Sequence, residues 1–217
     1  LLMPDTDEDG ISDYDEIFIY GTGQTEADTD KDGASDGTEV RIGTNPLVAD
    51  DLFHVTAVAG EEDSVHVSVT CDLVGSQVDS LCVSRVNNKL LFPENMPGYI
   101  GGAYEFTVNG KFDSATIKFE FNKSLLENTD FEPVIYYFNE ESQLLEPLQT
   151  KVDGNIASAS VTHFSKYVLL NRKIFENSFE WQDVWTTSDY EGVEIVLVID
   201  DSGSMWSNDG LNQRLSV

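Results

Sequence analysis

The sequence predicts a mainly β fold in which two acidic metal-binding loops precede an antiparallel β-sandwich, and the first strand of an α/β domain closes the chain. Three observations predict it. An acidic twelve-residue pattern occurs twice near the N-terminus, at least seven short segments rich in β-branched and aromatic residues fill the middle, and an unbroken apolar run lies near the C-terminus. The 217 residues suffice for one large domain or for two to three small ones.

Negative charge is concentrated at the N-terminal end. The chain has a net charge of −28, and residues 1–51 hold fifteen Asp or Glu against two Lys or Arg, a net charge of −13. This charge would repel phosphate, so it argues against nucleic acid as a partner and favours cations. The sequence has no run of about 18 apolar residues, so we expect no membrane span in this segment.

The first acidic pattern, DTDEDGISDYDE, covers residues 5–16. Oxygen-bearing residues alternate along it, and Gly10 stands at the sixth position, where a calcium loop must turn sharply. Calcium takes six to eight hard oxygen ligands, and such a turn brings alternate side chains to one centre. The predicted ligands are Asp5, Asp7, Asp9, the carbonyl of Ile11, Asp13 and Glu16.

The same pattern returns 23 residues later, with Gly33 at the turn. A solvated acidic linker is the plain alternative, but two complete matches favour calcium. An entering and an exiting helix do not fit between the two loops, and Asp50 begins a third loop that is not continued, so we interpret it as a terminal cap. The second set of predicted ligands is Asp28, Asp30, Asp32, the carbonyl of Ala34, Asp36 and Glu39.

Because of these two loops, the N-terminal segment 1–51 resembles the thrombospondin type 3 repeats of bacterial surface proteins. The resemblance covers about residues 4–51. The resemblance implies that Ca²⁺ occupies two sites, that the chain wraps around its ions with little hydrophobic core, and that the segment is a spacer stiffened by calcium. Without metal, the carboxylates should repel one another and the segment should loosen.

From residue 52 to 170 the composition becomes that of a sheet protein. Turn signals such as PENMPG, VNGK and VDGN separate the apolar segments. Several segments alternate apolar with polar residues, which predicts an antiparallel β-sandwich. The expected strands cover residues 53–59, 64–70, 81–86, 104–108, 115–121, 133–138 and 156–170.

The two cysteines, Cys71 and Cys82, flank the segment DLVGSQVDSL. A hairpin centred near Ser76 and Gln77 would let their side chains face each other and form a disulfide, consistent with an exported protein. Two small buried thiols are the other interpretation, and the sequence leaves both open.

The expected last strand carries the triplet His163, Phe164 and Ser165. The triplet resembles the cleavage site of self-cleaving ZU5-type sandwiches, in which the Phe–Ser bond is cut. The resemblance implies that Ser165 attacks the carbonyl of Phe164 with His163 as the base, and that water hydrolyses the resulting ester. The alternative is a purely structural sandwich with a coincidental triplet. Any enzymatic activity would be this single intramolecular cleavage.

Near the C-terminus, residues 193–217 contain the run VEIVLVID followed by DSGS. A fully apolar strand suits a parallel sheet buried on both faces, and a loop at its carboxyl end is the usual place for a site. Asp200, Ser202 and Ser204 resemble the metal-ion-dependent adhesion site of von Willebrand factor A domains. That family completes the site with a Thr and an Asp from later loops, so we expect Mg²⁺ there only in a full-length protein. Residues 171–192 are the expected linker.

The sequence therefore predicts a calcium-stabilised, secreted or cell-surface modular protein whose A-type domain binds an unidentified protein or matrix ligand. If the sandwich cleaves itself, the two fragments should stay paired without a covalent bond. The alternative is a set of structural and binding modules without self-cleavage. The chain opens without Met, and we expect it to be a piece of a longer protein.

Overall fold

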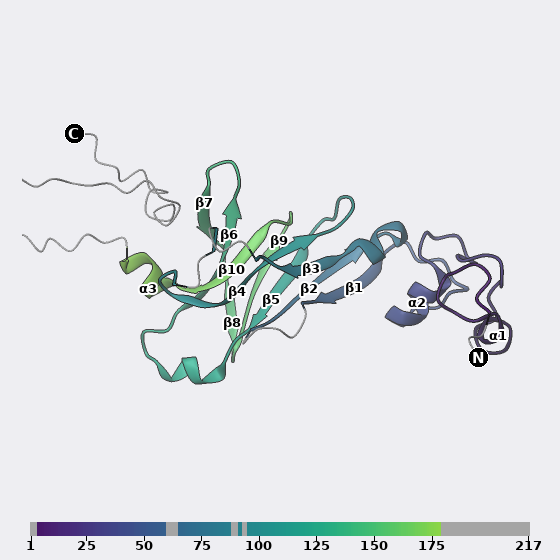
Figure 1. Cartoon of the computed structure of the whole chain (residues 1–217), viewed down its shortest axis with the longest axis horizontal. Helices are drawn as coiled ribbons and strands as arrows, with labels where there is room; N and C mark the ends of the chain where they lie inside the picture. The colour runs from purple at the N-terminus through teal and green to yellow at the C-terminus, as the bar shows by residue number, and fades with distance from the viewer. Residues whose placement is uncertain (1–3, 60–64, 88–90, 93–94, 179–217) are drawn as a thin grey trace, which may run out of the picture.

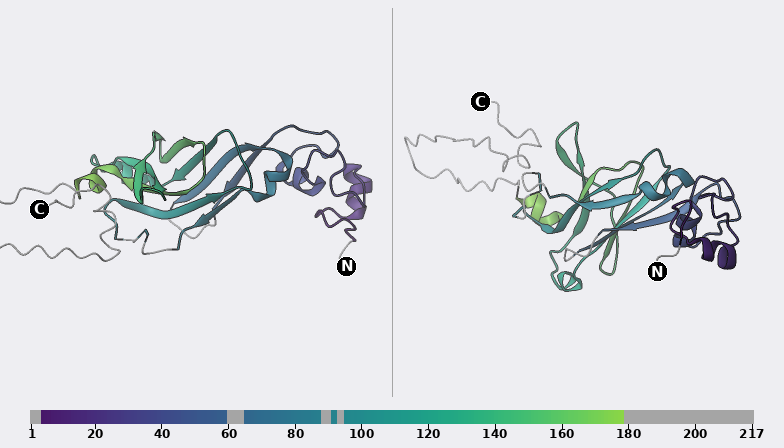
Figure 2. Two further views of the ribbon diagram at one scale, coloured as in Figure 1. Left: turned by 90° about the horizontal axis from the view of Figure 1, so that it is seen from above. Right: turned by 45° about the vertical axis from the view of Figure 1, so that its right-hand side comes forward.

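The computed structural model describes residues 4–59, 65–87, 91–92 and 95–178. Within them the molecule is elongated. The two acidic loops lie at one end, the sheets form the middle, and helix α3 (Arg172–Asn177) lies at the opposite end (Figure 1; Figure 2). The expected A-type domain, with Asp200, Ser202 and Ser204, lies outside the described residues.

Two five-stranded antiparallel sheets form the predicted sandwich. Sheet A has the order β1-β2-β5-β9-β8, with β1 Phe53–Val58, β2 His66–Leu73, β5 Ala115–Glu120, β9 Ile156–Val161 and β8 Lys151–Asp153. Sheet B has the order β3-β4-β10-β6-β7, with β3 Cys82–Arg85, β4 Tyr99–Thr107, β10 Lys166–Asn171, β6 Pro133–Asn139 and β7 Leu144–Pro147. The short helices are α1 Asp13–Asp15, η1 Glu16–Tyr20, α2 Asp36–Ile42, η2 Gly75–Ser80 and η3 Lys123–Glu127.

Strict alternation builds the inner face of sheet A. In β5, Ala115, Ile117 and Phe119 are buried, while the residues between them are exposed. The register places Ile117 opposite Val69 of β2, so apolar side chains line the same face on neighbouring strands. Because side chains in a strand point alternately to opposite faces, this pattern gives sheet A one buried face and one solvated face.

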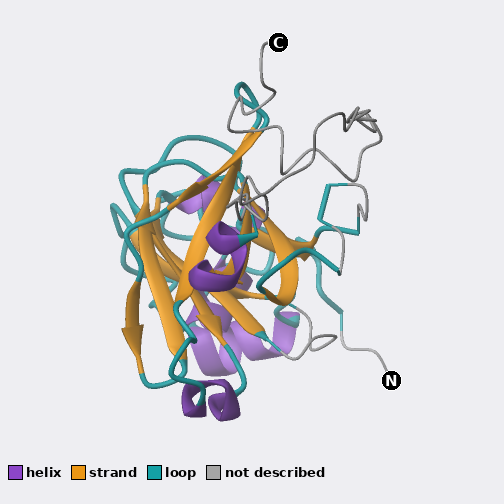
Figure 3. Cartoon of the chain, turned by 90° about the vertical axis from the view of Figure 1, so that its left-hand side faces the viewer, coloured by secondary structure: helices purple, strands orange, loops and turns teal. Residues whose placement is uncertain are grey.

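Sheet B is buried on both faces, which explains its unbroken apolar runs. Its outer face is covered by the segment that precedes β4 and by α3, whose Phe175 packs against Tyr136 with ring centroids 5.2 Å apart. Figure 3 shows α3 in front of the strands when the molecule is viewed along its length. Residues 171–177 thus belong to the sandwich, and the expected linker starts later than residue 171. The outer cluster consists of Phe92, Met96, Ala103, Val134, Tyr136, Phe138, Val168, Leu170 and Phe175.

The sandwich is confirmed, but the expected last strand over 156–170 is two strands. Strand β9 ends at Val161 in sheet A, and β10 begins at Lys166 in sheet B. The triplet from His163 to Ser165 therefore lies in the crossover between the sheets and not within a strand. The short strands β7 and β8 were not predicted.

The hairpin that would join the cysteines does not form. Helix η2 stands between β2 and β3, which belong to different sheets. Cys71 is buried with its Sγ 3.5 Å from the carbonyl oxygen of Ser114, whereas Cys82 is exposed, and both thiols are free. The disulfide interpretation was wrong because it required the two strands to be neighbours.

A buried asparagine fastens the end of β10. Asn171 is 4% exposed, and its side chain accepts a hydrogen bond from the backbone N–H of Glu132 and donates one to the carbonyl of Asp130. Its own backbone N–H donates to the carbonyl of Gly98. One side chain thus ties β10 to the loop that leads into β6.

We predict that Asn171→Ala lowers the free energy of unfolding by about 2 kcal/mol, because two partly buried backbone groups lose their hydrogen-bond partner. Urea unfolding followed by circular dichroism in calcium buffer measures this. Asn109→Ala, at an exposed position, should change stability little. Equal losses for the two variants would contradict the structural role of Asn171.

Candidate metal centre

The two acidic loops fold in the same way. In each, the fourth residue is left-handed, at φ 62° for Glu8 and 67° for Lys31, and the sixth is a glycine near φ 100°. The first aspartate then accepts a hydrogen bond from that glycine, from Gly10 to Asp5 and from Gly33 to Asp28. Glycine is the residue that adopts this φ without strain, so the sequence pattern determines the turn.

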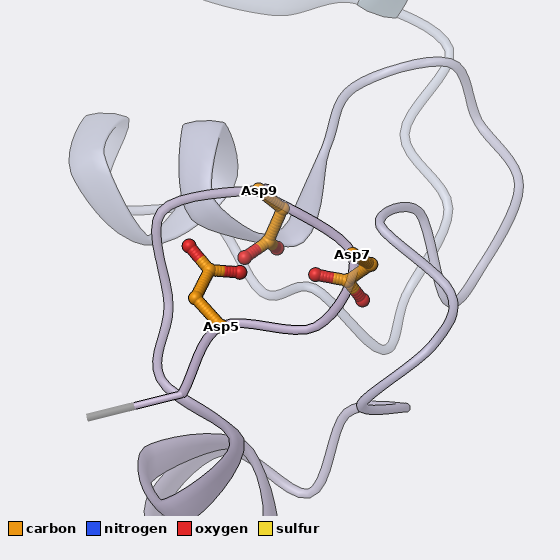
Figure 4. A group of neighbouring side chains, drawn as sticks. All are labelled: Asp5, Asp7 and Asp9. Atoms are coloured by element: carbon orange, nitrogen blue, oxygen red, sulfur yellow. The ribbon is translucent and has the colours of Figure 1, made fainter. Parts of the chain in front are cut away.

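Three carboxylates converge inside each turn. One oxygen from each of Asp5, Asp7 and Asp9 lies within 4.8 Å of the others, and Asp28, Asp30 and Asp32 form the same group in the second loop. Figure 4 shows the first three side chains pointing toward one centre from successive parts of the loop. Three like charges at this spacing repel one another strongly unless a cation lies between them.

Oxygens without hydrogen-bond donors surround both centres. They include the Glu16 Oε2 and Glu39 Oε2 atoms at the twelfth loop positions, and both glutamates are fully buried. Buried polar atoms nearly always have a partner, so such a set of bare carboxylate oxygens fits a bound cation. The atoms are Asp5 Oδ1, Asp7 Oδ1, Asp7 Oδ2 and Glu16 Oε2 in the first loop, and Asp30 Oδ2 and Glu39 Oε2 in the second.

Without an ion, the same crowding favours protonation. Burial, and then the charge of Asp30, raises the pKa of Glu39 to about 7. Burial also raises the pKa values of Glu16, Asp9 and Asp30, with further contributions from neighbouring aspartates. A cation in the loops would replace these protons.

The ninth loop positions have a different role from the three converging aspartates. Both oxygens of Asp13 accept hydrogen bonds from the backbone N–H and the hydroxyl of Thr6, and Asp36 is bonded in the same way by Thr29. These pairs close the loop. The ninth residue of such loops often reaches the ion through a water molecule, and this arrangement is compatible with that contact.

The residues that sequence reasoning missed are threonines with repeated positions. Thr6 and Thr29 follow the first aspartate of each loop. Thr22 and Thr44 donate from their hydroxyls to Glu16 Oε1 and Glu39 Oε1, at 3.4 and 3.3 Å. Their recurrence in both repeats was the available signal.

The seventh positions of the loops are both buried. Ile11 and Ala34 donate their backbone N–H groups to the fifth-position aspartates, Asp9 and Asp32. Ala34 also belongs to the main core of the sandwich. The second loop is therefore packed directly against the β-domain.

Helix α2 and helix η2 complete this junction. The Thr38 hydroxyl donates to Asp79 Oδ2 at 2.7 Å, and Arg41 pairs with the other oxygen of Asp79. A Cβ atom at Gly75 would collide with the backbone of Ala34. The backbone N–H of Asp50 donates to Asp32 Oδ2, so Asp50 does cap the second loop.

Each side chain of the crossover triplet contacts a different neighbour. Ser165 Oγ donates to the carbonyl of Phe138 at 2.9 Å, and within the described residues no hydrogen bond joins it to His163. The exposed His163 stacks edge-on to Tyr137, and the Phe164 ring packs between Phe106 and Phe112.

We predict that calcium affinity rises with pH through about 7, because calcium binds the deprotonated carboxylates. Calorimetry at about pH 6, in buffers of different ionisation enthalpy, should show protons released on binding, and at about pH 8 the release should be smaller. Glu140→Gln, which removes an exposed carboxylate of lowered pKa outside the loops, should not change this release. The same affinity and no proton release at both pH values would contradict the prediction.

The calcium-free chain should show the opposite trend. The folded pKa of Glu39 lies above its ordinary value of 4.5. Its contribution to stability is therefore complete below the ordinary value and is lost as the pH rises through about 7. Circular dichroism melts in chelator should show the repeats less stable at about pH 8 than at about pH 6. A repeat segment that gains stability over this range without calcium would refute this assignment.

Comparison with known families supports the loops only. Residues 5–22 and 28–49 match the family model of the bacterial TSP3 repeat. Comparisons with curated proteins and with solved structures found no match. These two segments, with their converging carboxylates, indicate a calcium-binding, extracellular modular protein.

Proposed function

We propose that residues 5–49 bind two calcium ions, one in each loop, and act as a spacer that calcium makes rigid. The observation that carries this proposal is the set of buried, donor-free carboxylate oxygens around each group of converging aspartates. All the candidate ligands are hard oxygens. Calcium prefers such ligands, whereas softer metals prefer nitrogen or sulfur. Loops of this kind in extracellular modules bind calcium at about 10⁻⁴ to 10⁻³ M, which suits a calcium-rich exterior.

The proposed ligands follow the loop positions. In the first loop they are Asp5, Asp7, Asp9, the carbonyl of Ile11 and Glu16, and in the second they are Asp28, Asp30, Asp32, the carbonyl of Ala34 and Glu39. Asp13 and Asp36 would contribute through water. Each glutamate keeps one free oxygen and is held by a threonine through the other, so it is already oriented for the ion.

The second ion would fix the orientation of the sandwich relative to the repeats. Its loop carries Ala34, which is buried in the β-domain, and leads into α2, which is bonded to Asp79. Ordering this loop therefore orders the contact between the two parts. The result is a rod whose two ends, the first loop and α3, are held apart (Figure 1).

We place this rod outside the cell. The support is the bacterial TSP3 match. Among the described residues, no helix is long and apolar enough to cross a membrane. We further propose that residues 193–217 begin an A-type adhesion domain, with Asp200, Ser202 and Ser204 as part of a Mg²⁺ site that a full-length protein completes. That domain would bind a protein or matrix ligand.

For the sandwich we propose a structural role without self-cleavage. Ser165 donates its proton to the carbonyl of Phe138 and not to His163. In the described part of the chain, no cis peptide bond or left-handed residue occurs between 162 and 165. Strand β10 follows this bond and lies in the centre of sheet B.

We predict that Asp7→Asn and Asp30→Asn each weaken one calcium site at least about tenfold, because each removes one negative ligand from a three-carboxylate centre. Calorimetry on the chelator-treated chain measures the affinities. Only Asp30→Asn should also speed limited proteolysis between the repeats and the sandwich, since the second loop carries the junction. The control Asp113→Asn, at an exposed loop position, should change neither. Two undiminished sites in both variants would refute the assignment.

We predict a single full-length band for freshly purified protein on a denaturing gel, and a mass spectrum of the uncut chain. Ser165→Ala should give the same band. Two fragments that meet at Phe164–Ser165 in the wild type and disappear in Ser165→Ala would restore the self-cleaving interpretation.

A further inference from the structure

The first repeat exposes an apolar surface, here called the aromatic patch, made of Tyr14, Ile17, Phe18 and Ile19. These side chains are 51%, 52%, 69% and 63% exposed. The rings of Tyr14 and Phe18 lie 4.7 Å apart, centroid to centroid. Single exposed apolar residues are ordinary, but four of them within six residues, two of which are aromatic rings in contact, commonly mark an interaction site.

A one-residue insertion shapes this patch. Between the buried glutamate and the Gly–Thr pair that ends the helix, the first repeat has four residues (17–20) and the second has three (40–42). In both repeats the threonine bonds the glutamate, so the two ends of this stretch are held in place. The first repeat accommodates the extra residue as a π-helix, in which the N–H of Gly21 reaches the carbonyl of Glu16 at 2.6 Å.

The equivalent helix of the second repeat has no such patch. Helix α2 keeps the α pattern, with the N–H of Gly43 bonded to the carbonyl of Glu39 at 2.8 Å. Its residues Arg41 and Ile42 contact the sandwich. An inserted residue that widens a helical turn is often found at a functional site. The first repeat thus has a larger, more apolar face where the second has its contact with the β-domain.

The aromatic patch could not contact another repeat in the way that the second repeat contacts the first. Where the first loop meets α2, the N–H of Gly37 donates to Asp9 Oδ2, and a Cβ atom at Gly37 would collide with the Asp9 backbone. The equivalent residue in the first repeat is Tyr14, since each follows a Ser–Asp pair. A preceding loop could not approach Tyr14 in the way that the first loop approaches Gly37.

The negative charge of the first repeat indicates that a partner of the aromatic patch is positively charged. Residues 4–22 contain seven Asp or Glu and no Lys or Arg, so with the proposed Ca²⁺ bound their net charge is −7 + 2 = −5. With a net charge of −28, two copies meeting at this surface would repel each other. An apolar surface edged with Lys or Arg would be attracted, and cations also bind favourably over aromatic faces such as those of Tyr14 and Phe18.

We propose that the aromatic patch is a docking surface for a protein segment with apolar side chains flanked by Lys or Arg. The proposal rests on the proposed calcium spacer only because calcium would order the helix that carries the patch. Calcium binding can be measured separately on every variant, so failure of the spacer and failure of the docking surface are distinguishable.

The test uses a synthetic amphipathic helical peptide of Leu and Lys as the probe, with the whole chain in calcium. We expect the double variant Ile17→Ser/Phe18→Ser to bind this peptide at least about tenfold more weakly, since truncating central apolar contacts removes most of the binding energy. The control Val58→Ser, at a 70% exposed position on sheet A, should bind as the wild type does. A scrambled Leu/Lys peptide should bind weakly and equally to all three chains.

Several results would overturn the proposal. They are equal binding of the amphipathic peptide to wild type and double variant, equally tight binding of a Leu/Glu peptide, and a wild-type dimer in light scattering that the double variant lacks. If the double variant loses calcium binding, Phe18→Ser alone decides the matter, because Phe18 is the most exposed of the four residues.

Discussion

Repulsion between carboxylates held in a tight turn governs the two N-terminal repeats of this structure. The glycine near φ 100° in each loop brings one oxygen from each of three aspartates within 4.8 Å of the others. Burial and the charges of these aspartates raise the pKa of a buried glutamate in the same loop. Several of these oxygens are buried and accept no hydrogen bond within the described residues. Only protons or a cation can relieve the repulsion between these carboxylates. A divalent cation does so while the carboxylates stay charged and bind it. We therefore expect the fold of the repeats to depend on ion binding.

The consequences extend beyond the loops because the second loop is part of the sandwich interface. Ala34 belongs to the main core, and Asp79 holds both Thr38 and Arg41 of α2. The loop backbone and Gly75 approach so closely that even a methyl group would not fit. An ion in this loop would thus act on a contact between two parts of the protein and would give the proposed spacer a defined orientation. Within the described part of the chain, no hydrogen bond or ion pair joins the first loop to the sheets, and its helix presents the aromatic patch.

Local patterns predicted what depends on local chemistry. The loop spacing gave both groups of aspartates, and β-branched runs located strands such as β5 and β6 within a few residues. Features that depend on packing between distant segments were missed. One strand was predicted over 156–170, although the apolar alternation changes phase between Val161 and Phe164, which is where the chain changes sheets. Similarly, Cys71 and Cys82 look like hairpin partners until β2 and β3 are found in different sheets.

The second core and the junction could not be predicted for the same reason. Unbroken runs such as PVIYYF and YVLL indicate strands buried on both faces, but only the fold shows that α3 and the segment before β4 cover sheet B. Gly75 and Asp79 carry no motif at all. Their importance comes from the backbone of Ala34 and from Thr38, which lie about forty residues earlier in the chain.

Amide hydrogen exchange with and without calcium tests the central claim most directly, because it reports separately on the loops, the junction and the sheets. With calcium removed by a chelator, the account predicts that the amides of Ile11, Ala34 and Gly43 lose protection while those of β5 and β10 keep theirs. Protection of the loop amides that does not depend on calcium would contradict it.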